Sequence, residues 1–176
     1  MLTLARALQA LDDVWNHKPS EMALTWNTRV QFDHELIPHL VADYTALNQR
    51  FDALATRIET EKAAAAELVA ACAEELHRLR HTEALRLYPV IARALSADPV
   101  ARRLFWQSRL VMLGIARRIF RRLDELARAL RNDAGIPIAV EHAAKAFVEY
   151  RQRNETEIYP LYRLAKSRDA GATHAA

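Results

Sequence analysis

The segment Arg80–Pro89 reads RHTEALRLYP, and its ending recurs in Arg151–Pro160, which reads RQRNETEIYP. Alignment of the two segments on Tyr-Pro places Arg80 over Arg151. Both segments carry ionisable residues in the middle of an apolar helical stripe. Burying an unpaired charge is costly, so such residues need a partner or a metal ion. The repeat therefore predicts matching turns on two helices of one bundle, with a polar layer between them.

The composition around this repeat indicates a mostly helical single domain. Of the 176 residues, 51% are apolar and only three are glycine, and strand-like alternation is nearly absent. The single Cys72 excludes an internal disulfide and a cysteine-based zinc site, and its position suits a buried thiol. No run reaches the ~18 apolar residues of a membrane span, and the N-terminus does not read as a secretory signal. We therefore expect a cytoplasmic protein without a membrane partner.

Helical periodicity predicts a short N-terminal helix followed by four long helices. Residues 1–14 are amphipathic, and the sequence HKPS at 17–20 ends that helix. The long helices are expected over residues 24–58, 60–95, 99–130 and 137–166. Short turns between helices of this length favour an all-α, up-down-up-down four-helix bundle. The domain organisation we expect is an N-terminal helix and linker over 1–20, the bundle over 21–167 and a disordered tail over 168–176.

Local signals mark where the long helices begin and which faces they bury. Asp98 is expected to cap the third long helix, with Pro99 at its first position. Pro38 lacks a backbone donor, so we expect it either to kink the first long helix or to mark its effective start, with Asp33 as the N-cap in the second case. The buried apolar stripe of the third long helix is expected to include Leu104 and Val111.

Helical wheels place polar side chains at one level of this bundle. On the second long helix, Glu83 falls at the centre of the apolar stripe, with Arg80 beside it. On the fourth, Arg151 and Asn154 fall inside the stripe. The flanks of these helices and the first long helix add His77, His81, Glu155, Asp33 and His34.

Two interpretations of this layer remain open. Bundles of this kind hold metals between facing helices, and imidazole with carboxylate suits iron, manganese or zinc. The candidate ligands are His34, His77, His81, Glu83 and Glu155. Alternatively, Arg80 and Arg151 pair with the two glutamates in a neutral network that also holds Asn154, with both helix-flank histidines at the surface. Two guanidinium cations inside the layer would oppose a divalent metal strongly.

The apolar-Tyr-Pro endings, His34 near the start of the first long helix and the duplicated helix pair resemble the hemerythrin-like, HHE cation-binding domain family. The resemblance covers residues 24–166. It implies a four-helix bundle that holds a di-iron or related centre in its interior. Members of the family bind or sense oxygen, sense redox state, store iron or repair iron–sulfur clusters. The resemblance thus implies a cation-binding or sensing module, with iron as the expected metal.

This chain departs from the ligand pattern of that family. The pattern before each aromatic-Pro pair is His, three residues, Glu, two residues and an apolar residue. In one copy Arg151 replaces the His, while Glu155 matches the Glu. In the other copy Arg80 replaces the His and Ala84 replaces the Glu, and the third long helix contains no His. Only His34 and Glu155 match, so the resemblance implies a partial or lost metal site.

The third long helix carries the strongest charge asymmetry in the chain. Between residues 99 and 131 it has nine Arg against one Asp and one Glu. This favours either an acidic protein partner at Arg117, Arg118 and Arg121 or a solvated face paired with acidic residues of the second long helix. No DNA-binding motif accompanies the charge, so a nucleic-acid partner is not expected.

The alternative to a cation-binding module is a metal-free regulatory or partner-binding bundle. It would dock a protein through the arginine-rich helix or through the N-terminal helix, or form a homodimer. No phosphate-binding loop or nucleophile motif is present, so a non-enzymatic role is favoured.

Overall fold

The structure is a computed structural model that describes residues 32–58, 61–132 and 136–165. All the secondary structure in these residues is helical, and none of them forms a strand. The elements are α3 Leu36–Arg57, α4 Lys62–Thr82, η2 Glu83–Leu87, α5 Tyr88–Ala94, α6 Pro99–Asn132, α7 Ile136–Arg153 and η3 Asn154–Ile158, where η marks a π-helix. Residues 159–165 continue the last helix. The all-α prediction is confirmed, while the predicted N-terminal helix, linker and tail lie outside the described residues.

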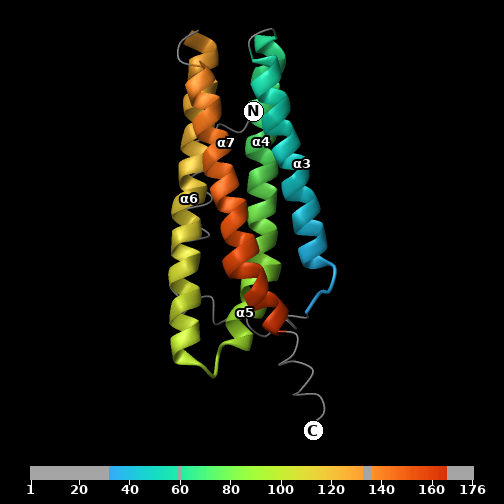
Figure 1. The fold of residues 1–176 in the computed structure, drawn as a ribbon, viewed down its shortest axis with the longest axis vertical. Coiled ribbons are helices and arrows are strands. Elements are labelled where there is room, and N and C mark those ends of the chain that lie inside the picture. The colour runs from blue at the N-terminus through green and yellow to red at the C-terminus, as the bar shows by residue number, and fades with distance from the viewer. Residues whose placement is uncertain (1–31, 59–60, 133–135, 166–176) are drawn as a thin grey trace. The chain divides into compact units, whose positions relative to one another are not determined.

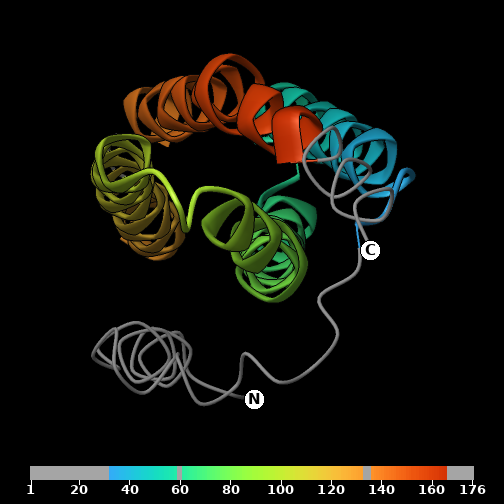
Figure 2. The ribbon, with the colours of Figure 1, turned by 90° about the horizontal axis from the view of Figure 1, so that it is seen from below.

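The helices form four rods that pack side by side. One rod is α4 continued by η2 and α5, and another is α7 continued by η3 and residues 159–165. α3 contacts α4 and α7, and α6 contacts the same two helices, so each rod has two neighbours (Figure 1). Figure 2 shows the rods end-on, arranged around a shared interior. Side chains that face inward from different rods can therefore contact one another in this interior. None of the described helices is long and apolar enough to cross a membrane.

Aspartates mark two helix starts, one of them as predicted. Asp98 Oδ1 accepts hydrogen bonds from the backbone N–H of Val100 at 3.1 Å and of Ala101 at 3.0 Å. These donors have no partner within the helix, so Asp98 caps α6. Asp33 instead holds a turn before α3, because its Oδ1 accepts from the backbone N–H of Glu35 at 2.9 Å. Of the two options predicted at Pro38, the structure has an effective start there, because α3 begins at Leu36 and residues 32–35 are not helical.

Both Tyr-Pro endings follow π-helical turns, which the sequence analysis did not predict. The backbone N–H of Tyr88 bonds the carbonyl of Glu83, and that of Tyr159 bonds the carbonyl of Asn154. The proline after each tyrosine has no N–H, and its ring crowds the carbonyl four residues earlier. A π-turn, closed by a hydrogen bond over five residues, occurs mostly as a single turn inside an α-helix, as it does here. The two repeated segments therefore share one backbone distortion.

The buried face of α6 is rotated about the helix axis relative to the face predicted from the sequence. Leu104 is 58% exposed and Val111 is 45% exposed, so their assignment to the core is wrong. The inner face includes Met112 and Ile119, which successive rotations of about 100° per residue place away from Leu104 and Val111. On α4, Cys72 is a buried thiol, as predicted.

Candidate functional site

Glu83 lies inside the bundle and accepts four hydrogen bonds. Its Oε1 accepts from Tyr44 OH and from Asn154 Nδ2, the latter at 2.9 Å. Its Oε2 accepts from Tyr150 OH at 2.6 Å and from Tyr88 OH at 3.3 Å. Glu83 is 0% exposed, so protein donors replace the water that the carboxylate loses on burial. A carboxylate has about four lone-pair sites, and all are occupied here.

Arg80 supplies the positive charge that accompanies this carboxylate. It is 1% exposed, and its Nη1 donates to Tyr150 OH over 2.8 Å. The Tyr150 hydroxyl therefore accepts from Arg80 and donates to Glu83, linking a buried cation to a buried anion. We call Glu83 and the side chains joined to it in this way the Glu83 network. Its members are Tyr44, Arg80, Glu83, Tyr88, Tyr150 and Asn154.

The π-turns place the two polar residues at the centre of the network. Glu83 is the first residue of η2 and Asn154 is the first residue of η3. They occupy equivalent positions in the repeated segments, because each stands five residues before the tyrosine of Tyr-Pro. Both are 0% exposed. The equivalent residues of the two repeated segments therefore face each other in the structure.

Burial in this network raises the pKa of its tyrosines above the ordinary value. Desolvation is the largest cause for Tyr44 and Tyr88, and the charge of Glu83 adds to it. Desolvation also dominates the raised pKa of Tyr150, where Arg80 opposes it and Glu83 reinforces it. The phenols are therefore held in the protonated form, which is the form that donates to a carboxylate.

Arg109 of α6 extends the charged layer beyond the network. Its guanidinium carbon lies 4.7 Å from the ring centroid of Trp106 and 5.2 Å from that of Tyr88. Burial lowers the pKa of Arg109 to about 10, with Tyr88 opposing and Arg80 adding to the decrease. Arg109 is one of the nine arginines that were predicted to give this helix its charged face. The structure instead buries it between aromatic rings, where a cation–π contact is favourable.

The expected metal ligands do not gather around Glu83. His34, His81 and Glu155 are exposed, and His77 is half-buried. Among the described residues, no group of three or more His, Cys, Asp or Glu side chains could hold a metal ion. The lone pairs of Glu83 are already used, and Arg80 stands beside it. These residues therefore do not fit the iron centre that the family resemblance implies.

The expected quartet of two arginines and two glutamates is divided between the interior and the surface. Arg80, Glu83 and Asn154 are buried. The expected burial of Arg151 is wrong, because its side chain is 35% exposed and lies 3.6 Å from the carboxylate of Glu155, measured from Nε to Oε1. This surface pair contributes little, since exposed ion pairs are worth about 0–1 kcal/mol.

The tyrosines that hold Glu83 were not predicted from the sequence. The first long helix was expected to present Asp33 and His34 at this level, but the residue of α3 that bonds Glu83 is Tyr44. A signal was present, because Tyr44 and Tyr150 stand at inward positions and buried tyrosine hydroxyls need hydrogen-bond partners. A buried glutamate on a facing helix is such a partner.

The solvent face of α6 carries apolar side chains followed by arginines. Val100, Leu104, Leu110 and Val111 are exposed, and we call them the α6 apolar strip. Three of them recur at spacings of four and seven residues, which keeps them on one side of the helix. Exposed arginines flank and follow the strip; they are Arg102, Arg103, Arg117, Arg118 and Arg121.

These arginines differ in how far they are already paired. Arg118 Nη1 donates to Glu149 Oε2 of α7 over 2.9 Å. Arg103 and Arg121 form no ion pair within the part of the chain that the structure describes. Of the three arginines predicted to bind a partner, Arg121 is therefore more available than Arg118 to pair with a partner's carboxylate. Arg103, which was not predicted, is available in the same way.

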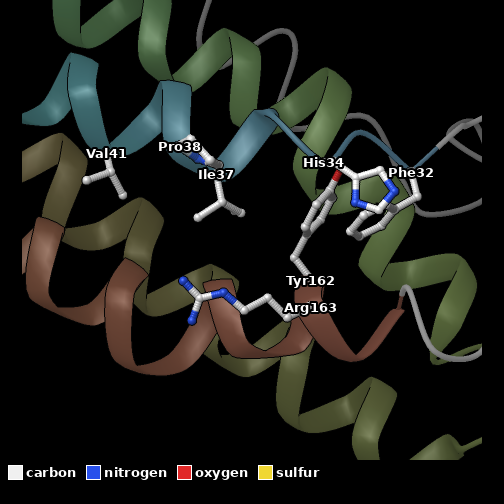
Figure 3. A pocket seen from close by; sticks show the side chains of 7 residues that line it. All are labelled: Phe32, His34, Ile37, Pro38, Val41, Tyr162 and Arg163. Carbon is white, nitrogen blue, oxygen red and sulfur yellow. The ribbon is translucent and has the colours of Figure 1, made fainter.

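An open pocket lies at one end of the bundle, between the start of α3 and residues 159–165. Its lining residues are Phe32, His34, Ile37, Pro38, Val41, Tyr162 and Arg163, drawn in Figure 3. Its volume is about 370 Å³. The pocket contains His34 but none of the other expected metal ligands, so it is separate from the Glu83 network.

Comparison of the chain with protein-family models, curated proteins and solved structures found no match. The hemerythrin-like resemblance therefore rests on the residues quoted for it.

Proposed function

We propose that this protein is a metal-free helical bundle that binds a partner protein through the solvent face of α6. The observation that carries the proposal is the α6 apolar strip, whose residue Val100 is 70% exposed and whose residue Leu110 is 66% exposed. Apolar side chains gathered on an exposed face are typical of interaction surfaces. Arginine is also enriched at such surfaces. Arg103 flanks this strip, and Arg121 follows it along α6.

The Glu83 network supports the metal-free part of this proposal. It fills the interior layer with a carboxylate, a guanidinium and phenols that satisfy one another. Under the proposal, the chain keeps the up-down-up-down order of a hemerythrin-like bundle, and the network takes the place of the metal centre. The interior then serves stability, and recognition takes place on the outside.

The partner we propose is an amphipathic helix of another protein with acidic residues beside its apolar face. Side chains at spacings of four and seven residues on α6 match the repeat of such a helix. Carboxylates on the partner would complement Arg103 and Arg121, which the described part of the chain leaves without an ion pair. A basic partner would meet the same arginines and be repelled.

The test uses a synthetic helical peptide with Leu at spacings of four and seven residues and Glu at the flanking positions. Its binding to the full chain is measured by fluorescence anisotropy. A second peptide carries Lys in place of each Glu. We expect the acidic peptide to bind, the basic peptide not to bind, and Leu104→Ser/Val111→Ser to weaken binding about tenfold or more. Added salt should weaken it too, because the charges are exposed.

Matched variants separate the face from general effects. Leu85→Ser removes an exposed leucine of η2 and should leave binding unchanged. Arg103→Glu/Arg121→Glu should abolish binding of the acidic peptide, whereas Arg93→Glu on α5 should not. Equal binding by wild type and Leu104→Ser/Val111→Ser would refute the proposal. So would a dimer in sedimentation that this double variant dissociates, because the strip would then bind a second copy of the chain.

A further inference from the structure

The pocket in Figure 3 has the size and the walls of a small-molecule site. Ligand pockets have volumes of roughly 300–1,000 Å³, and this one measures about 370 Å³. Ile37, Pro38 and Val41 of α3 form one side. Val41 is 38% exposed, so an apolar surface is left open to solvent there.

A stack of rings closes one end of the pocket. Phe32 stacks on Tyr162 with ring centroids 4.7 Å apart, and His34 meets Phe32 edge-on at 5.0 Å. Tyr162 OH donates to the backbone carbonyl of Asp33 over 3.0 Å and accepts from its N–H over 2.9 Å. The hydroxyl of Tyr162 is therefore committed, and a ligand would meet chiefly its ring.

The charge of the pocket is positive. Arg163 lies along the side opposite Ile37 and Val41 in Figure 3 and is exposed. It has no ion pair within the described residues. Among the described residues, the lining includes no Asp or Glu, and the nearby Asp33 is already paired with Arg86. An anion near Arg163 would therefore be attracted without competition from a lining carboxylate.

We infer that this pocket binds a small amphipathic carboxylate. Its apolar chain lies against Ile37, Pro38 and Val41, and its carboxylate accepts hydrogen bonds from the Arg163 guanidinium. A planar guanidinium can bind both oxygens of a carboxylate at once. The inference goes beyond the proposed function and does not depend on it, because none of the pocket residues belongs to α6.

The experiment titrates the full chain with octanoate and with octylammonium, which have the same apolar chain length and opposite charge. Methyl NMR signals of Ile37 and Val41 report binding at the pocket, and those of Val100 and Val111 report binding at α6. We expect saturable shifts at Ile37 and Val41 with octanoate and a much weaker response to octylammonium. Arg163→Gln should weaken octanoate binding about tenfold.

Control variants distinguish this pocket from the partner face. Arg93→Gln and Leu104→Ser/Val111→Ser should bind octanoate as the wild type does. Val41→Asp should weaken binding, because it puts a carboxylate into the apolar side that the ligand's chain contacts. The inference is overturned if Ile37 and Val41 do not respond, if octylammonium binds equally, if Arg163→Gln has no effect, or if only the α6 methyl groups shift.

Discussion

Glu83 and Asn154 occupy equivalent positions in the two repeated segments, and they bond to each other inside the bundle. Asn154 Nδ2 donates to Glu83 Oε1 over 2.9 Å, although 71 residues separate the two in sequence. Each begins a π-turn that precedes Tyr-Pro. The repeat thus builds one interior site from two halves. One half contributes the acceptor and the other contributes a donor, so the pair is complementary where a symmetric pair of carboxylates would repel.

Replacing Glu83 by Gln should destabilise the fold strongly. The substitution removes the charge that accompanies Arg80 and turns one acceptor into a donor among side chains that donate. Leaving a buried charge uncompensated in this way costs about 3–5 kcal/mol. We expect Glu83→Gln to lower the urea midpoint, followed by circular dichroism, with little change in the denaturant slope.

Glu155→Gln is the matched control for this substitution. Glu155 stands on the rod that contains Asn154, but its side chain is 45% exposed and pairs with Arg151 at the surface. Its loss should cost less than about 1 kcal/mol. If the two glutamine variants unfolded at the same urea concentration, the buried network would not be a main source of stability.

Two tyrosine substitutions should differ in their effect on stability, although each removes one buried hydroxyl. Tyr150 OH bonds both Arg80 and Glu83, so Tyr150→Phe should cost about 1–3 kcal/mol. Tyr159 OH is also buried but has no hydrogen-bond partner in the described part of the chain. Tyr159→Phe should therefore be neutral or slightly stabilising. Thermal unfolding of both variants checks this, and an equal loss of stability would contradict the hydrogen-bond assignment.

The sequence predicts the helices better than it predicts the layer. Helix ranges follow from apolar periodicity and from caps such as Asp98, which are local signals. The burial of Glu83 and Arg80 also follows from the wheel of a single helix. The partner of Glu83 on α3 does not, because the level at which two rods meet depends on loop geometry and on π-turns. Because of loop geometry and the π-turns, the residue that contacts Glu83 is Tyr44, where His34 was predicted.

The same limit explains the two errors on α6. A helical wheel fixes the angles between side chains but not the direction of the bundle interior. The sequence analysis assigned Leu104 and Val111 to the core and Arg109 to the charged face, and the structure reverses both. Arg109 is tolerated inside because Trp106 and Tyr88 offer it ring faces. Leu104 and Val111 are exposed as a result, and the binding face proposed on α6 depends on that exposure, which periodicity alone does not predict.

High pH should unfold the protein by ionising its tyrosines. The chain has five tyrosines, and burial raises the pKa of every one above 10.0. A folded-state pKa above the unfolded value means that stability is full below pH 10 and is lost as the pH rises further. We expect phenolate absorbance to appear together with the loss of helical circular dichroism. In urea it should appear near pH 10. Phenolate formed at that pH in the folded protein would contradict the burial of these side chains.

Acid should weaken the fold partly through His77. Burial lowers the pKa of His77 below 6.5, and the charges of His81 and Arg80 lower it further. Because the unfolded chain then takes up this proton first, stability is full above about pH 6.5 and falls as the pH drops from there to the lower folded-state value. His77→Gln removes the effect, so its urea midpoint should fall less between pH 7 and pH 5 than that of the wild type. His39→Gln, at an exposed position of α3, controls for loss of an imidazole, and a wild-type slope in the His77 variant would exclude His77 as the source.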